Sequence, residues 1–148
     1  MNLTLKNILL LFLISTASVT SWAETLKCSY SSPLPPGQRI TDIELTSNAG
    51  VVVAVSYLGM FTTGKETPGY NCHFDATEKN TVWSRQGSKS IGTVTDEFEE
   101  QSIFSVTTSG HSYRIEFEDM GRNWCGAQAE FPRSVEITKG VNKCKVQY

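Results

Sequence analysis

The stretch Tyr113-Arg114-Ile115-Glu116-Phe117-Glu118 alternates strictly between bulky apolar and charged side chains. Successive side chains of a β-strand point to opposite faces of its sheet, so this stretch has one face for a core and one for solvent. Similar period-two patterns recur along the chain, whereas the 3.6-residue period of an amphipathic helix hardly appears. The sequence therefore predicts an all-β fold.

A hairpin and a central strand are predicted in the first half of the chain. Residues 41–46 alternate in the same way, and Asn48-Ala49-Gly50 is typical of a turn. The run Val51–Leu58 that follows is apolar on both faces and rich in β-branched residues. We expect this run to form a central strand that is covered on both sides.

Five more segments have strand character, and Gly, Pro, Asn and Ser separate them: Leu26–Tyr30, Val82–Arg85, Ser102–Thr107, Val135–Thr138 and Cys144–Tyr148. A total of about seven to eight strands fits a small antiparallel barrel or sandwich. The stretch Ser31–Gly37 holds three prolines. Because proline lacks the backbone N–H that a sheet interior needs, we expect an exposed connecting loop there.

The amino terminus has the pattern of a cleavable signal peptide. Lys6 precedes the apolar run Ile8–Ile14, and Ser21-Trp22-Ala23 places small residues at the two positions that a signal peptidase reads. A membrane-spanning helix needs about 20 predominantly apolar residues, and here polar residues follow after seven. We predict a signal peptide over residues 1–23 and one domain over residues 24–148. The mature domain is expected in the periplasm or outside the cell, with no stable membrane span.

The charge of the expected mature chain argues against a nucleic-acid partner. Residues 24–148 keep all 15 acidic side chains and 12 of the 13 basic ones, a formal net charge of −3. Nucleic-acid binders have clustered Lys and Arg and a high pI instead.

Cys28, Cys72, Cys125 and Cys144 are the four cysteines of the chain, and an even number in an exported domain of this size predicts two disulfides. The sequence leaves three pairings open. We favour Cys28 with Cys144, because chain ends often meet in a closed or sandwiched sheet, and Cys72 with Cys125. A zinc site is the alternative, but the cysteines lack the paired short spacing of zinc ligands. We therefore predict no metal and no cofactor.

Catalytic motifs are missing from the sequence. It holds no Gly-x-Ser-x-Gly elbow, no His-Glu-x-x-His and no Gly-rich phosphate loop followed by Lys. His73 and His111 are the two histidines, and the closeness of Ser109 and Ser112 to His111 in sequence does not give a catalytic triad its geometry. We predict that the protein is not an enzyme.

Acidic residues crowd into one short segment: Asp96, Glu97, Glu99 and Glu100. A glycosidase uses two carboxylates, but it needs a cleft for which a domain this small has little room. A solvated acidic loop is one interpretation. The other is a docking patch whose negative potential speeds the encounter with a cationic protein.

The segment Ser109-Gly110-His111-Ser112-Tyr113 resembles the Ser-Gly-x-x-Tyr segment of the bacterial membrane-bound and periplasmic inhibitors of c-type lysozyme. That family has a small exported β-barrel, and the resemblance implies a loop that inserts into the active-site cleft of lysozyme. Ser109 and Tyr113 would then be inhibitory contacts, and Gly110 would permit the conformation of the loop. The alternative is an ordinary turn, with Tyr113 as the first inward residue of its strand.

The segment Met120–Phe131 is rich in small residues, and a disulfide through Cys125 would hold it against the sheet. It could present Arg122 and Trp124 to a partner, but packing of Trp124 over the disulfide is the interpretation that we favour. The predicted function is that of an exported, non-catalytic binding protein, with inhibition of a lysozyme-like cell-wall hydrolase as its specific form. The alternatives are an interaction or structural domain of the cell envelope, such as an adhesin or assembly accessory, and an immunity protein against a rival's periplasmic toxin.

Overall fold

Two antiparallel sheets form the described part of the chain, residues 22–35, 37–62, 69–126 and 129–148, in the computed structural model. The first sheet contains, in this order, β1 (Ala23–Leu34), β2 (Gly37–Asn48), β3 (Val51–Thr62) and β4 (Tyr70–Ala76). The second contains β5 (Thr81–Gln86), β6 (Lys89–Thr95), β7 (Gln101–Ser109), β8 (Ser112–Asp119), β9 (Ser134–Thr138) and β10 (Lys145–Gln147), also side by side in chain order. Each sheet is therefore a meander in which every strand pairs with the next one along the chain.

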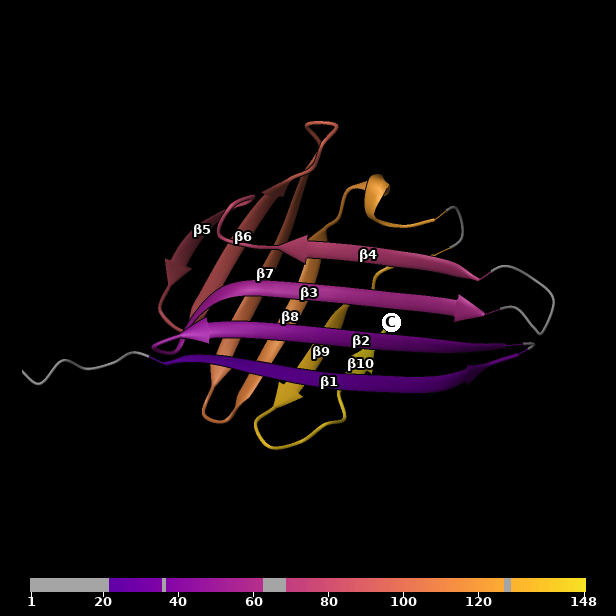
Figure 1. Ribbon diagram of the computed structural model, residues 1–148, viewed down its shortest axis with the longest axis horizontal. Coiled ribbons are helices and arrows are strands. Elements are labelled where there is room, and N and C mark those ends of the chain that lie inside the picture. Colours follow the sequence, from indigo (N-terminus) through magenta and orange to yellow (C-terminus); the bar gives the residue numbers. More distant parts are fainter. Residues whose placement is uncertain (1–21, 36, 63–68, 127–128) are drawn as a thin grey trace, which may run out of the picture.

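The two sheets are stacked as a sandwich. In Figure 1 the strands of the four-stranded sheet run across the view, and those of the six-stranded sheet cross behind them at a steep angle. The sheets do not share a strand, so they are not closed into a barrel. The all-β prediction is confirmed, and of the two predicted forms, barrel and sandwich, the protein has the sandwich.

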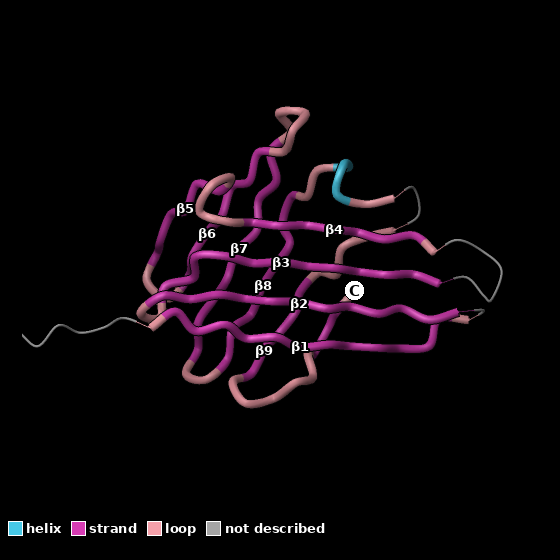
Figure 2. The backbone as a smooth tube through the Cα atoms, in the orientation of Figure 1, coloured by secondary structure: helices cyan, strands magenta, loops and turns pink. Residues whose placement is uncertain are grey.

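One short helical turn, η1 (Arg122–Trp124), interrupts the strands between β8 and β9 (Figure 2). It is the only helix in the described ranges, and no helix there has the length and apolar character to cross a membrane.

The core between the sheets is rich in aromatic rings. The ring of Phe74 on β4 lies 5.2 Å from that of Phe104 on β7, and Tyr57 on β3 lies 5.2 Å from Phe117 on β8, both in edge-to-face arrangements. Such pairs add a directional contribution to the burial of apolar area. These contacts lock the two sheets together.

β3 departs from the sequence prediction in how it is covered. It is an inner strand of its sheet, as expected, and Val52, Val55 and Tyr57 are buried on its inner face. The alternate residues Ala54 and Leu58 are only partly buried. The expectation of cover on both sides was wrong, because the sandwich has two layers and the second sheet lies against one face alone.

All eight predicted strands are present, and two more were missed, β4 and β6. On β6 the inward residues are the small Ser90 and Gly92 and then Val94. A Cβ atom on Gly92 would lie 2.4 Å from the Phe104 ring on the neighbouring β7. The small side chains leave room for that ring, so this strand lacks the apolar alternation by which strands are recognised.

Most of the proline-rich stretch is the end of β1, whereas we predicted an exposed connecting loop there. β1 continues to Leu34, and β2 begins at Gly37. β1 is an edge strand, and the Ser29 N–H points away from β2, to the Asn142 carbonyl. Pro33 lies four residues further on, on the same outward side, so its missing donor costs no ladder hydrogen bond.

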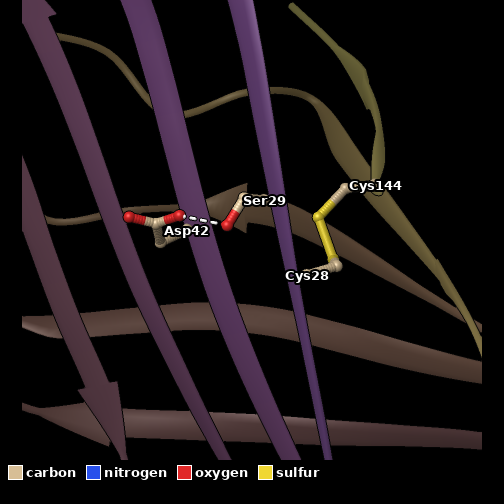
Figure 3. The surroundings of a disulfide bond; sticks show 4 residues. All are labelled: Cys28, Ser29, Asp42 and Cys144. Carbon is tan, nitrogen blue, oxygen red and sulfur yellow. Dashed lines mark hydrogen bonds between the residues drawn. A yellow bond between two sulfur atoms is a disulfide. The ribbon is translucent and has the colours of Figure 1, made fainter. Parts of the chain in front are cut away.

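Each edge of the four-stranded sheet is tied to the carboxy-terminal half of the chain by a disulfide. Cys28 on β1 bonds Cys144, and Cys72 on β4 bonds Cys125. Figure 3 shows the first bridge, beside which the Ser29 hydroxyl donates a hydrogen bond of 2.5 Å to Asp42 on β2. The favoured pairing is confirmed. Two disulfides are typical of proteins that work in an oxidising, extracellular environment.

The predicted signal peptide lies outside the described residues, except for its last two positions. Trp22 is 84% exposed, and Ala23 is the first residue of β1. The boundary at Glu24 therefore falls one residue inside that strand.

Candidate functional site

The predicted inhibitory segment forms a tight turn between β7 and β8. Ser109 pairs with Ser112 at the end of the ladder, and Gly110 has a φ of 56°, a conformation that favours glycine. The Tyr113 side chain is only 2% exposed and faces the core. Ser109 and Gly110 are therefore at the surface, whereas Tyr113 is not available to a partner in this structure.

The predicted acidic patch forms the connection between β6 and β7, which we call the acidic loop, Asp96–Glu100. Asp96 folds the loop from inside: one carboxylate oxygen accepts the backbone N–H groups of Phe98 at 2.9 Å and Glu100 at 2.8 Å. Two of the four acids, Glu97 and Glu99, are exposed. Between them Phe98 is 68% exposed, so the loop presents an aromatic ring flanked by carboxylates.

Side chains from a distant segment, Gly121–Gly126, tie the acidic loop to the sandwich. The Asn123 amide donates to the second oxygen of Asp96 at 2.8 Å and to Glu100 at 3.0 Å. The hydrogen bond from Asn123 to Asp96 is the main reason why the pKa of Asp96 lies below its usual value. The acidic loop is thus held by hydrogen bonds within the loop and by hydrogen bonds from Asn123.

The base of the same segment is fixed at β7. The buried Ser102 hydroxyl accepts hydrogen bonds from the Gly121 N–H and the Trp124 indole N–H, both at 2.8 Å. The Trp124 ring packs 5.1 Å from Phe74 in the core. The disulfide of Cys125 holds the other end of the segment on β4. Trp124 is thus a packed residue, as we favoured, but the ring that it contacts is Phe74 in the core.

A hollow of about 380 Å³ lies beside the acidic loop. Its walls include the aromatic residues Phe98 and Trp124 and the acidic residues Asp96 and Glu97. Aromatic faces and carboxylates are the groups that attract a Lys or Arg side chain. The hollow is therefore chemically suited to a cationic side chain from another protein.

The two predicted sites lie at opposite ends of one strand. β7 begins one residue after the acidic loop and ends at Ser109. At about 3.3 Å per residue the strand separates the two regions by about 26 Å. The structure does not bring them together into one site.

A second concave surface, which sequence analysis did not find, is a groove of about 650 Å³ lined by Phe117 on β8, by residues of the β8–β9 connection and by Tyr148. We call it the arginine groove. The apolar side chains that line it include Phe117, Met120, Phe131, Pro132 and Tyr148, and the charged ones are Arg122, Glu130 and Arg133.

Arg39 on β2 does not itself line this groove, but it contacts two residues that do, Glu130 and Tyr148. Its guanidinium group stacks 3.5 Å from the centre of the Tyr148 ring and lies 4.8 Å from that of Phe61. It donates from Nη2 to Glu130 at 3.2 Å, while its buried Nε has no hydrogen-bond partner among the described residues. The Arg39 side chain is 16% exposed. This is a largely buried cation whose donors are only partly used.

The alternation of β2 could have revealed Arg39. It shares the inward parity of Thr41 and Ile43, so the pattern that predicted the strand also places an arginine on its inner face. Its partners Glu130 and Tyr148 could not be foreseen, because they lie about a hundred residues further along the chain and carry no motif.

Other chemistry-bearing residues are dispersed in the described ranges. No group of three or more His, Cys, Asp or Glu side chains there could hold a metal ion. His73 lies on the surface, 2.9 Å from Asp75, and its side chain is 65% exposed. No known protein family, curated protein or solved structure matches this chain.

Proposed function

We propose that this is an exported, non-catalytic binding protein that recognises a cationic protein through the acidic loop. The observation that carries the proposal is the exposed Phe98, which lies between Glu97 and Glu99. Its loop is held by Asp96 from within and by Asn123 from the neighbouring segment. A convex loop that is already ordered loses little conformational entropy on binding. An exposed aromatic residue at its tip is a typical hot-spot anchor.

The charges of the loop favour a cationic partner over a neutral one. The Glu97 and Glu99 carboxylates form no ion pair within the described part of the chain, so their field is not cancelled by a neighbouring cation. Charges at the rim of an interface that are complementary to those of the partner mainly raise the association rate, and salt screens them. A basic side chain of the partner would enter the hollow between Phe98 and Trp124.

A lysozyme-like cell-wall hydrolase is the specific partner that we propose. Such an enzyme is cationic and has a cleft that a protruding loop can enter, and the resemblance at Ser109–Tyr113 suggests the same target. The burial of Tyr113 weakens the part of that resemblance that depends on its side chain. The acidic loop, which is exposed and fixed, is the better candidate for the inserted element.

The test is binding to c-type lysozyme and inhibition of its activity by the mature protein. Phe98→Ala is expected to weaken binding about tenfold or more, as loss of a hot spot does. The matched control is Val82→Ala on β5, since Val82 is 75% exposed and lies outside the hollow. Glu97→Gln is expected to lower the association rate more than Glu44→Gln, which removes an acid from the other sheet.

Four outcomes would contradict parts of this proposal. No binding at micromolar concentration rules out the lysozyme version. Equal losses in Phe98→Ala and Val82→Ala rule out the acidic loop as the contact. A loss in Ser109→Ala with none in Phe98→Ala would move the contact to the β7–β8 turn. Binding without inhibition would favour the envelope interaction domain.

A further inference from the structure

We infer that the arginine groove binds a small amphipathic carboxylate, an apolar chain that ends in a carboxylate group, with Arg39 as the anchoring residue. This site is separate from the acidic loop and does not depend on the proposed protein partner. Three features carry the inference: the unused donor of Arg39, the way in which Glu130 reaches it, and the lining of the groove.

The first feature is the incomplete pairing of a nearly buried cation. An arginine presents Nε and one Nη as parallel donors, which match the two oxygens of a carboxylate. In Arg39 the Nη2 donor is used and the buried Nε is not. A buried donor without an acceptor costs free energy that a correctly placed ligand oxygen recovers.

The second feature shows that a carboxylate can approach from the groove. Glu130 lines the groove and reaches Nη2 of Arg39 with one oxygen, at 3.2 Å. Its own side chain is 67% exposed, so it can turn into solvent. A ligand carboxylate in its place would accept from both Nε and Nη2, which the Glu130 carboxylate does not do.

The third feature is the composition of the groove. Phe117, Met120 and Phe131 offer apolar contact for a chain. Arg122 and Arg133 are exposed at its edge and form no ion pair among the described residues. Cations therefore outnumber the single acid, Glu130, so the groove attracts an anion. Its volume of about 650 Å³ is within the range of small-molecule sites.

The experiment is calorimetric titration of the mature protein with dodecanoate, with dodecanol and dodecyltrimethylammonium as probes of the same chain length. Dodecanoate is expected to bind at one site, at least tenfold more tightly than dodecanol, and the cationic probe is expected not to bind. Equal binding of all three would overturn the inference, because it would show that only the apolar chain is recognised. Failure of dodecanoate to bind would overturn it as well.

Two substitutions give opposite expected changes. Arg39→Met is expected to weaken dodecanoate binding tenfold or more, whereas Arg85→Met, on the exposed β5, is the control and should not change it. Glu130→Gln is expected to strengthen binding severalfold, because it removes the competing carboxylate. The Glu130 side chain is 67% exposed, so Glu130→Gln is expected to fold normally and tests the site even if Arg39→Met is unstable. Weaker binding in Glu130→Gln would overturn the assigned role of Arg39.

Discussion

The acidic loop and the β7–β8 turn join β7 to its two neighbours in the sheet, but they are built in different ways. The turn is closed by a glycine with positive φ and by backbone pairing, with one backbone bond from Lys139 to the His111 carbonyl. The acidic loop is held by side chains from Gly121–Gly126, a segment that is itself fixed by a disulfide. An ordinary hairpin needs no such support.

We take this difference as support for the proposed binding role of the acidic loop. Support from outside a loop requires additional side chains and a long connecting segment. It is useful when the loop must keep one conformation before a partner binds. The same 121–126 segment also lines the arginine groove with Arg122 and Cys125. One tethered segment therefore serves both candidate sites, and the predictions that follow test that tether.

The largest effect is expected from removal of the tethering disulfide. Cys72→Ala with Cys125→Ala should lower the free energy of unfolding by about 2–5 kcal/mol. It should also speed hydrogen exchange at the Phe98 and Glu100 amides, because the segment that supports the acidic loop becomes free to move. Denaturant unfolding and amide exchange measure the two effects.

The control for that experiment is the other disulfide, Cys28–Cys144, which lies at the opposite edge of the sheet. Its removal should lower the free energy of unfolding by a similar amount. Exchange at the acidic-loop amides should then change only as far as global unfolding does. If both variants speed exchange at Phe98 equally, the loop does not depend on the tether.

An intermediate effect is expected from Ser102→Ala. The buried Ser102 hydroxyl is the acceptor for the Gly121 N–H and the Trp124 indole, so the change leaves two donors unsatisfied. Each such group costs about 1–3 kcal/mol, less whatever water can recover. We expect a total loss of about 2 kcal/mol in denaturant unfolding and a red shift of Trp124 fluorescence.

Ser105→Ala on the same strand is the matched control. Ser105 is also buried, but its hydroxyl donates to Glu118, whose side chain is 44% exposed and can turn to water instead. The loss should be about 1 kcal/mol, without a change in Trp124 fluorescence. Equal behaviour of the two variants would show that Ser102 has no special role in the tether.

Local patterns in the sequence predicted the strands where they carried the usual signal. Residues 113–118 alternate between apolar and charged side chains, and this strand was predicted with its correct inner face. β6 was missed because its inner face is filled from the neighbouring strand by Phe104. In that case the information lies in a pairing between strands, which period-two analysis of one segment does not contain.

The candidate sites also differ in how far local sequence patterns could predict them. The acidic loop is contiguous in sequence, so its charges were visible, although its support by Asn123 was not. Arg39 and Glu130, by contrast, are 91 residues apart and meet only through the stacking of the sheets. A site formed from separate strands appears in the sequence only as an unexpected charge at an inward position.

The smallest effect is local and depends on pH. The hydrogen bond from Asn123 lowers the pKa of Asp96, and so do those from the Glu100 and Phe98 amides. Because the folded pKa lies below the unfolded one, the stabilising contribution is complete above the unfolded pKa, about 3.9. It is lost as the pH falls through the still lower folded value. The acidic loop should therefore loosen only below about pH 4, whereas the β7–β8 turn, which contains no carboxylate, should not change in that range.

Carboxyl NMR titration of Asn123→Ala tests this assignment. The pKa of Asp96 should move up towards its ordinary value, because the donor that lowers it most has been removed. Glu118 is the internal control, since its pKa is lowered chiefly by Ser105 and should stay unchanged. If the pKa of Asp96 does not move, Asn123 does not hold the loop in solution. The contrast between a supported loop and a simple turn would then rest on Asp96 and the loop backbone alone.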